Sequence, residues 1–235
     1  IVAGGLVGLL CRGAITQRLQ QALLRSCGVA VMFVGIAGTL EKMLSASLVA
    51  DGTIALASGG TMMMVVCLAV GTVLGEALDL DARFEDLGVW LRENTGSSGD
   101  VRFVDGFVTA SLTVSIGAMA IVGSIQDGLS GDYSTLMLKG ALDAIIVCAM
   151  AASMGRGCLF SALPVGVLQG SMTALATLLH PIMTEAALAN LSLVGSMLVF
   201  CVGVNLIWPR TFKPANMLPS VAIAVVYALI AQAVA

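Results

Sequence analysis

Hydrophobic residues in this chain form long continuous runs that are separated by short polar segments. Each run has roughly the 20 residues that an α-helix needs to cross the hydrocarbon core of a bilayer. Because lipid offers no hydrogen-bonding partners, the backbone of each run must pair with itself, and runs of this length favour helices over barrel strands. The pattern predicts an all-α polytopic transmembrane helix bundle with about eight spans, in a single integral membrane domain over residues 1–235.

The sequence opens at Ile1, inside an apolar run and without a methionine, so we expect a few residues upstream. On this interpretation Ile1–Leu10 is the end of a first span and not a cleaved signal peptide. The predicted spans are, in chain order, a first run that ends near Cys11, then Ser26–Leu40, Thr61–Leu78, Phe103–Ile125, Leu136–Met154, Leu159–Leu179, Met183–Ile207 and Met217–Ala235.

Two of the polar segments have an amphipathic pattern. In Ala14–Arg25, apolar residues recur at helical spacing opposite basic and amide residues. In Asp81–Glu93, Phe84, Leu87 and Trp90 share one helical face, with charged residues elsewhere. Both patterns predict short helices along the inner membrane surface. A solvated helix that packs on neighbouring loops is the alternative for each.

Composition agrees with a membrane protein. The chain is 58% hydrophobic and 11% charged, with a mean hydropathy of +1.02, whereas soluble proteins carry about 25% charged residues. The net charge of −3 and the lack of a basic cluster argue against nucleic acid as a partner. The lipid bilayer is the partner that we expect.

The distribution of basic residues predicts the orientation. Lys and Arg collect in cytoplasmic loops, and the even-numbered segments between spans hold only Lys42 and Lys139. We therefore predict a multi-pass protein of the bacterial inner membrane with both termini outside. The basic residues of the odd-numbered segments are Arg12, Arg18, Arg25, Arg83, Arg92, Arg102, Arg156, Arg210 and Lys213.

Small residues recur at the spacing that lets helices approach closely. Examples are the pairs Gly4/Gly8, Gly71/Gly75 and Ser111/Ser115. These faces exceed what one compact bundle needs, so we expect a homo-oligomer, most simply a two-fold dimer. Short matches between the halves, such as Arg-Gly after the first and fifth spans, suggest a duplication of residues 1–129 in 130–235.

Polar residues at membrane depth are costly and are therefore candidates for substrate or ion binding. Asp143 lies two turns into the fifth span, and Lys139 lies one turn earlier on the same face, so the two can also form a structural pair. We expect the outer-side residues to converge on a polar vestibule that opens to the outside. The candidate binding residues are Gln126, Asp127, Lys139, Asp143 and Gln169, together with Glu76 near the inner end of the third span, for which a structural role is the alternative.

Pro164, Gly166 and Gly170 interrupt the sixth span close to Gln169. A proline inside a helix frees a backbone carbonyl, and such discontinuous helices often form the binding sites of transporters. This span is therefore the expected position of a broken or gating helix. A packed kink is the alternative.

Motifs for catalysis and metal binding are absent from the sequence. There is no H-E-x-x-H, G-x-S-x-G or P-loop motif, and none of the six cysteines belongs to a C-x-x-C pair. His180 is the single histidine. We therefore expect a protein that is not an enzyme and has no metal or cofactor.

Several stretches are similar to an uncharacterised family of bacterial membrane proteins, the domain of unknown function 554 or YqgA-like family. The resemblance covers essentially the whole chain, which implies a membrane protein and possible transporter without an assigned substrate. The stretches are the opening AGGLVGLL, the segment Gly71–Leu80, the run Gly106–Asp132 with the following Lys139–Asp143, the segment Phe160–Gly170, and Asn216–Pro219.

The resemblance and the buried polar residues favour a transporter or channel for a small solute or ion. A non-transporting membrane scaffold or sensor is the first alternative. An intramembrane enzyme that uses paired carboxylates, such as Asp127 and Asp143, is the second.

Overall fold

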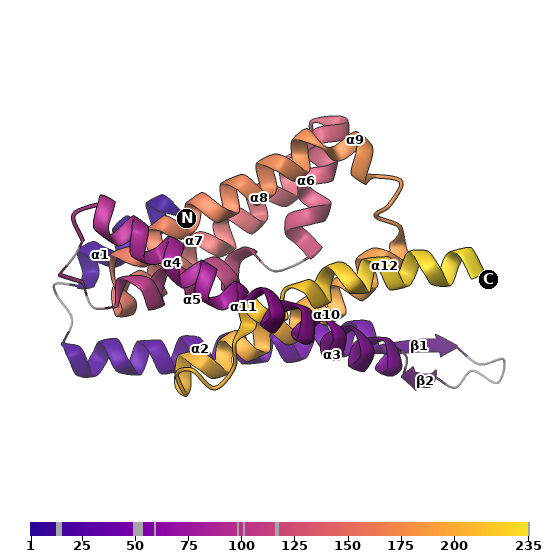
Figure 1. Ribbon diagram of the computed structural model, residues 1–235, viewed down its shortest axis with the longest axis horizontal. Coiled ribbons are helices and arrows are strands. Elements are labelled where there is room, and N and C mark those ends of the chain that lie inside the picture. Colours follow the sequence, from indigo (N-terminus) through magenta and orange to yellow (C-terminus); the bar gives the residue numbers. More distant parts are fainter. Residues whose placement is uncertain are drawn as a thin grey trace.

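The computed structural model describes residues 1–12, 16–48, 54–58, 60–97, 99–100, 102–115 and 118–234 (Figure 1). Its helices form an elongated bundle. In chain order the elements are α1 (Val2–Arg12), α2 (Gln17–Met43), β1 (Leu44–Leu48), β2 (Ile54–Ser58), α3 (Thr61–Leu78), α4 (Leu80–Asn94), α5 (Phe103–Ser115), α6 (Ala118–Ser130), α7 (Ser134–Met154), the 3-10 helix η1 (Arg156–Ser161), α8 (Ala162–Ala174), α9 (Ala176–Leu179), α10 (Glu185–Ile207), α11 (Pro214–Met217) and α12 (Pro219–Val234).

The prediction of a polytopic helical bundle is confirmed. The described residues contain six helices that are long and apolar enough to cross a membrane, and α5 with α6 makes a seventh candidate if the bent pair is one span. The shorter apolar helix α1 occupies the position of the first of the eight predicted spans. The observed bounds of α3 coincide with the predicted third span.

The segment before the second predicted span does not form a separate surface helix. Residues Gln17–Met43 are one continuous helix, which begins where the Thr16 hydroxyl accepts a hydrogen bond from the Leu19 amide. The prediction of an independent helix over Ala14–Arg25 is therefore wrong where the structure describes it, and Ala14 and Ile15 lie outside the described residues. A Thr N-cap and an uninterrupted helical sequence explain the continuity.

The second amphipathic segment does form a helix, α4, and it packs on a neighbour. Gly88 and Leu91 lie against Val104 and Phe107 of α5. Trp90, at 58% exposure, projects from another side of the helix. The predicted helix is therefore confirmed, and its position along the inner membrane surface stays a prediction.

A β-hairpin between α2 and α3 was not predicted. Strands β1 and β2 pair antiparallel with Leu44 opposite Ser58 and Leu48 opposite Ile54. Figure 1 shows the hairpin extending beyond the ends of α2 and α3. Each strand completes the backbone hydrogen bonds of the other, which gives this apolar connection a folded structure outside the helices.

Glycines bring several helices into contact at their backbones. A Cβ atom at these glycines would overlap main-chain atoms of the facing helix, so only glycine permits the approach. The contacts pair α1 with α7, α2 with α10, and α3 with α11 and α12. They are Gly4 with Ala144, Gly8 with Cys148, Gly35 with Ser196 and Phe200, Gly71 with Ser220, and Gly75 with Asn216.

These contacts alter the argument for oligomerisation. The faces that carry Gly4/Gly8 and Gly71/Gly75 are occupied by other helices of the same chain. They therefore give no support to the expected dimer, which no contact within a single chain tests.

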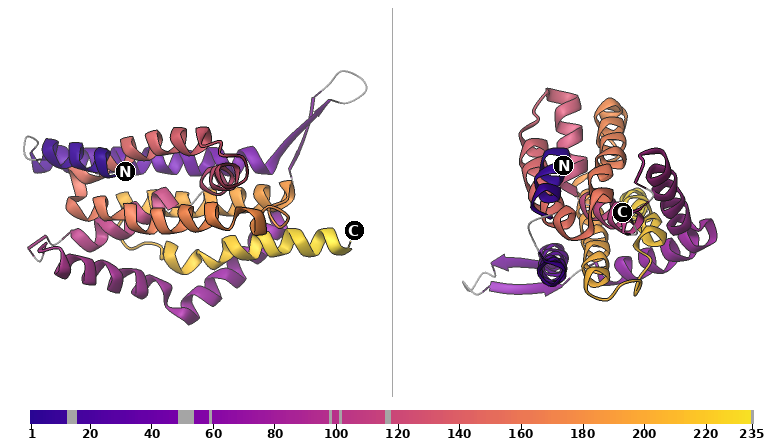
Figure 2. Two further views of the ribbon diagram at one scale, coloured as in Figure 1. Left: turned by 90° about the horizontal axis from the view of Figure 1, so that it is seen from above. Right: turned by 90° about the vertical axis from the view of Figure 1, so that its left-hand side faces the viewer.

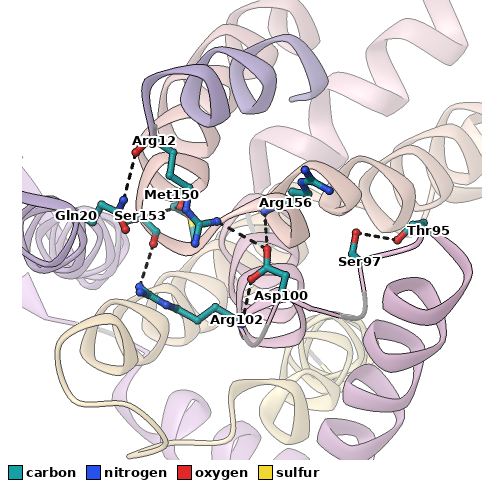
Figure 3. A network of polar contacts seen from close by, with 9 residues as sticks. All are labelled: Arg12, Gln20, Thr95, Ser97, Asp100, Arg102, Met150, Ser153 and Arg156. Atoms are coloured by element: carbon teal, nitrogen blue, oxygen red, sulfur yellow. Dashed lines mark hydrogen bonds and ion pairs between the residues drawn. The ribbon is translucent and has the colours of Figure 1, made fainter. Parts of the chain in front are cut away.

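The basic loops lie together at one end of the bundle. Arg12 and Arg156 meet the Asp100 carboxylate, and the Arg102 guanidinium donates to the Ser153 carbonyl (Figure 3). Figure 2 shows the C-terminus and the hairpin toward the opposite end. The segregation of positive charge is the arrangement that a bilayer selects when this end faces the cytoplasm.

We predict that a reporter active only outside the cytoplasm gives a signal when fused after Ala235 and none when fused after Asn94. The reason is that Arg83 and Arg92 of α4 and Arg102 after it all lie in the segment between the third and fourth predicted spans. Enzymatic assay of the two fusions in intact cells measures the orientation. The reverse pattern would contradict the predicted topology.

We predict that Gly75→Ala destabilises the protein by about 1–3 kcal/mol or more, because the new methyl group overlaps the Asn216 carbonyl. Gly166 of α8 has no neighbouring atom within 4 Å, so Gly166→Ala is the matched control. The control should leave stability unchanged or raise it by up to about 1 kcal/mol, since alanine favours helix. Thermal unfolding in a mild detergent measures both, and equal unfolding temperatures would refute the packing argument.

Candidate functional site

The fourth predicted span corresponds to two helices, and residues 116–117 between them lie outside the described part of the chain. Helix α5 ends at Ser115, α6 begins at Ala118, and their axes bend by 62°. The break was missed because the apolar run Phe103–Ile125 reads as continuous, although Gly117 in the sequence is a possible signal. A helix that ends inside a bilayer leaves carbonyl groups that need another partner.

Lys139 supplies a partner for one of these carbonyls. Its ammonium group donates a hydrogen bond of 2.7 Å to the Val114 carbonyl near the end of α5, and it also pairs with the Asp143 carboxylate. Lys139 and Asp143 are 7% and 6% exposed. The ammonium therefore neutralises both a buried carboxylate and the negative end of the α5 dipole.

Hydroxyl groups near the end of α5 retain hydrogen-bonding capacity. The Ser111 and Ser115 hydroxyls are buried and have no hydrogen-bond partner within the part of the chain that the structure describes. Thr113, between them, donates to the Thr109 carbonyl instead. Two polar groups within one helical turn of Val114 are thus available to a bound species.

Two of the predicted site residues lie in the last turn and a half of α6. The Thr135 hydroxyl donates to the Gln126 side-chain oxygen at 2.8 Å, and Thr135 lies one turn before Lys139 on α7. Asp127 is half-buried and forms no ion pair among the described residues. The structure therefore connects Gln126 to the helix face that carries the buried pair.

Gln169 lies half-buried in α8, and its side chain makes no hydrogen bond with the described residues. Helix α6 reaches α8 one turn further on, where Gly128 contacts the Thr173 carbonyl. Pro164 lies in the first turn of α8, where a proline displaces no interior helical hydrogen bond. The sharp break expected at Pro164 thus occurs in the fourth span instead.

Glu76 belongs to a different part of the molecule. Its carboxylate is 3.7 Å from the Lys213 ammonium, and both side chains are about half exposed. This ion pair lies at the end of α3, beside the α10–α11 connection, and it does not contact Lys139 or Asp143. The predicted binding residues therefore divide into two groups.

A cavity of about 560 Å³ lies beside Glu76 at the basic end of the bundle. Its polar lining combines carboxylates and cations, and its apolar lining includes Leu112, Val202 and Leu206. Sequence reasoning missed this cavity because its residues come from helices that are distant in the chain. The charged lining residues are Asp79, Asp81, Glu85, Asp105, Arg102, Arg210 and Lys213.

The cavity wall includes two residues with left-handed backbone. Asp79 has φ 46° and Arg210 has φ 61°, and they are the non-glycine residues with positive φ in the described parts of the chain. Such conformations cost about 1–3 kcal/mol each and often mark functional sites. Burial raises the pKa of the nearby Asp81 carboxyl, and the Lys213 ammonium partly opposes this rise.

Asn216 holds the bend between α3 and α4. Its side chain is fully buried, and its Oδ1 accepts a hydrogen bond of 2.7 Å from the Asp81 amide at the start of α4. The short helix α11 places the Asn216 backbone against Gly75 of α3. Asn216 therefore fixes the start of α4, where Asp81 lines the cavity.

Helix α5 links the cavity to the buried ion pair. Asp105, Thr109 and Leu112 of α5 line the cavity, and Val114 lies half a turn beyond Leu112. One helix thus carries both the cavity wall and the carbonyl that binds Lys139.

Within the described residues, no group of three or more His, Cys, Asp or Glu side chains could hold a metal ion.

The chain matches known proteins along nearly its whole length. It is 27% identical over 223 residues to the uncharacterised membrane protein YdfK of Bacillus subtilis, and the aligned region covers 95% of this chain and 89% of YdfK. It is 23% identical over 232 residues to the uncharacterised protein YqgA of Escherichia coli, covering 95% of this chain and 90% of YqgA. No solved structure matches. The model of the family described as protein of unknown function (DUF554) matches residues 1–229, and the chain belongs to this family.

Proposed function

We propose that this membrane protein is a transporter or channel for a small solute or ion in the bacterial inner membrane. The observation that carries the proposal is the Lys139 ammonium, which joins the Asp143 carboxylate to the Val114 carbonyl at a helix break. Discontinuous helices and buried ionisable groups are recurring components of ion and solute sites in transporters.

The arrangement couples the charge of Asp143 to the end of α5. A cation or proton that binds Asp143 weakens the attraction between Asp143 and Lys139, because both compete for the same carboxylate. Lys139 would then leave the Val114 carbonyl, and α5 could move relative to α6. The proposed cargo is therefore a cation or a solute that is coupled to proton movement.

The cavity beside Glu76 supplies the cytoplasmic part of the proposed route. Thr109 and Leu112 line it, and the unpartnered Ser111 and Ser115 hydroxyls lie on the same helix as these residues. Its volume of about 560 Å³ is sufficient for a small solute. Movement of α5 would change the cavity and the buried pair together.

The pairing of Asp143 favours translocation over the two alternatives. A carboxylate enzyme needs a second carboxylate beside Asp143, whereas the observed partner is the Lys139 ammonium. A scaffold needs no ionisable pair at a helix break, and such a pair costs desolvation energy. We therefore propose neither catalysis nor a purely structural role.

We predict that Asp143→Asn lowers transport at least about tenfold, because it removes the charge that binds the cation and preserves the shape. The purified protein is reconstituted into vesicles, and proton, sodium and potassium gradients are imposed in turn with an internal pH-sensitive dye and electrical recording. Asp132→Asn is the matched control, because Asp132 is exposed in the α6–α7 connection. It should retain full transport.

Two outcomes of this assay would contradict the site assignment. One is full transport by the double variant Lys139→Met with Asp143→Leu, which lacks both charges. The other is an equal loss of transport in Asp132→Asn and Asp143→Asn, because only Asp143 belongs to the buried pair.

We predict that Lys139→Met alone destabilises the protein by about 3–5 kcal/mol, because it leaves a buried carboxylate without its counter-charge. Adding Asp143→Leu should restore most of the loss. Lys213→Met, which breaks the half-exposed pair with Glu76, should cost about 1 kcal/mol or less. Unfolding in detergent compares the variants, and equal costs for Lys139→Met and Lys213→Met would refute the buried pair.

A further inference from the structure

A second cavity at the basic end has a different chemical character. Its volume is about 730 Å³, and leucines of α1 and two arginines line it. None of its lining residues is acidic, in contrast to the cavity beside Glu76. The lining residues are Leu6, Leu9, Leu10, Arg12, Gln20 and Arg156.

We propose that this cavity binds the anionic headgroup of a phospholipid in the inner leaflet. The two arginines would hold the phosphate, and the leucines of α1 would contact the acyl chain. Basic pockets at the cytoplasmic ends of transmembrane helices bind such headgroups in this way. The proposal concerns a lipid site and does not depend on the function proposed above.

Charge around the cavity is poorly compensated within the chain. Asp100 lies between Arg12 and Arg156 (Figure 3) and is 3.8 Å from the Arg12 guanidinium. Arg156 contacts Asp100 through its backbone amide, and its exposed guanidinium has no hydrogen bond or ion pair to the described residues. Arg102 likewise reaches Asp100 through its backbone amide, and its guanidinium donates to the Ser153 carbonyl. Asp100 thus pairs with the Arg12 guanidinium, and an anion in the cavity would supply the Arg156 guanidinium with a counter-charge.

The apolar part of the lining fits an acyl chain and not a free anion. Leu6 and Leu10 are 50% and 81% exposed, and their spacing of four residues places them along one face of α1. Arg12 ends α1 and Arg156 begins η1, whereas Leu6 lies near the middle of α1. This order matches a lipid whose phosphate lies at the membrane surface and whose chain lies deeper.

The test uses the whole protein, stripped of lipid in a neutral detergent. Native mass spectrometry measures the binding of phosphatidylglycerol and, separately, of phosphatidylcholine. Phosphatidylglycerol should bind several-fold more tightly. Arg12→Gln with Arg156→Gln should weaken its binding about 25-fold, since each arginine near an anionic surface contributes a factor of about five.

A matched control removes the same charge elsewhere. Arg25→Gln with Arg83→Gln changes two exposed arginines that do not line the cavity. This variant should keep its affinity for phosphatidylglycerol. An equal loss of affinity for phosphatidylglycerol in both double variants would mean that net charge alone determines binding, and it would overturn the proposal.

Two further measurements separate a lipid site from its rivals. Leu10→Ser should weaken phosphatidylglycerol binding and leave any binding of inorganic phosphate unchanged. If inorganic phosphate competes as strongly as the lipid, the cavity is a free-anion site and the lipid proposal is wrong. The single variant Arg156→Gln should fold normally, because the Arg156 guanidinium has no partner among the described residues. Unchanged lipid binding in this variant would also overturn the proposal.

Discussion

A helix that breaks inside a bilayer must find partners for the carbonyl groups that it exposes, and the architecture around α5 depends on this requirement. Lys139 meets it by donating to the Val114 carbonyl. A buried ammonium itself needs a counter-charge, and Asp143 provides that charge one turn along α7. The end of α5 and the polar face of α7 are therefore linked through the Lys139 ammonium, which contacts both the Val114 carbonyl and Asp143.

The rest of the bundle is held by a different interaction. Glycine contacts fix α7 against α1, and α10 against α2, with backbones too close for any side chain. Core residues such as Val147 and Leu198 fill the space around these helices. The ion pair thus lies on a firmly packed helix, α7, and faces a discontinuous one.

Local features of this structure could be predicted from the sequence, and non-local ones could not. The spans follow from run length, and the spacing of Lys139 and Asp143 allows a pair within one helix. The hairpin β1–β2 was not predicted, although the dipeptide Asp51-Gly52 between its two strands is a hairpin turn signal in the sequence. The cavity beside Glu76 was missed because its lining comes from several helices and from the α10–α11 connection.

The helix break shows why position in the chain is an incomplete guide to mechanism. Pro164 suggested a break in the sixth span, yet a proline in the first turn of a helix costs no hydrogen bond. The observed break lies near Ser115, where a lysine from another helix compensates it. The partner of a backbone carbonyl therefore decides whether a discontinuity is stable, and that partner is 25 residues away in sequence.

The two cavities at the basic end are connected through the same helix. Asp100 precedes α5 and meets the Arg12 guanidinium and the Arg156 amide beside the α1 cavity, whereas Asp105 and Thr109 line the other cavity. The far end of α5 carries the Val114 carbonyl. An anion beside Arg12 would compete with Asp100 for that arginine and would loosen one anchor of α5. Helix α5 thus has a charged anchor at each end, and a change in either one alters the forces on the other.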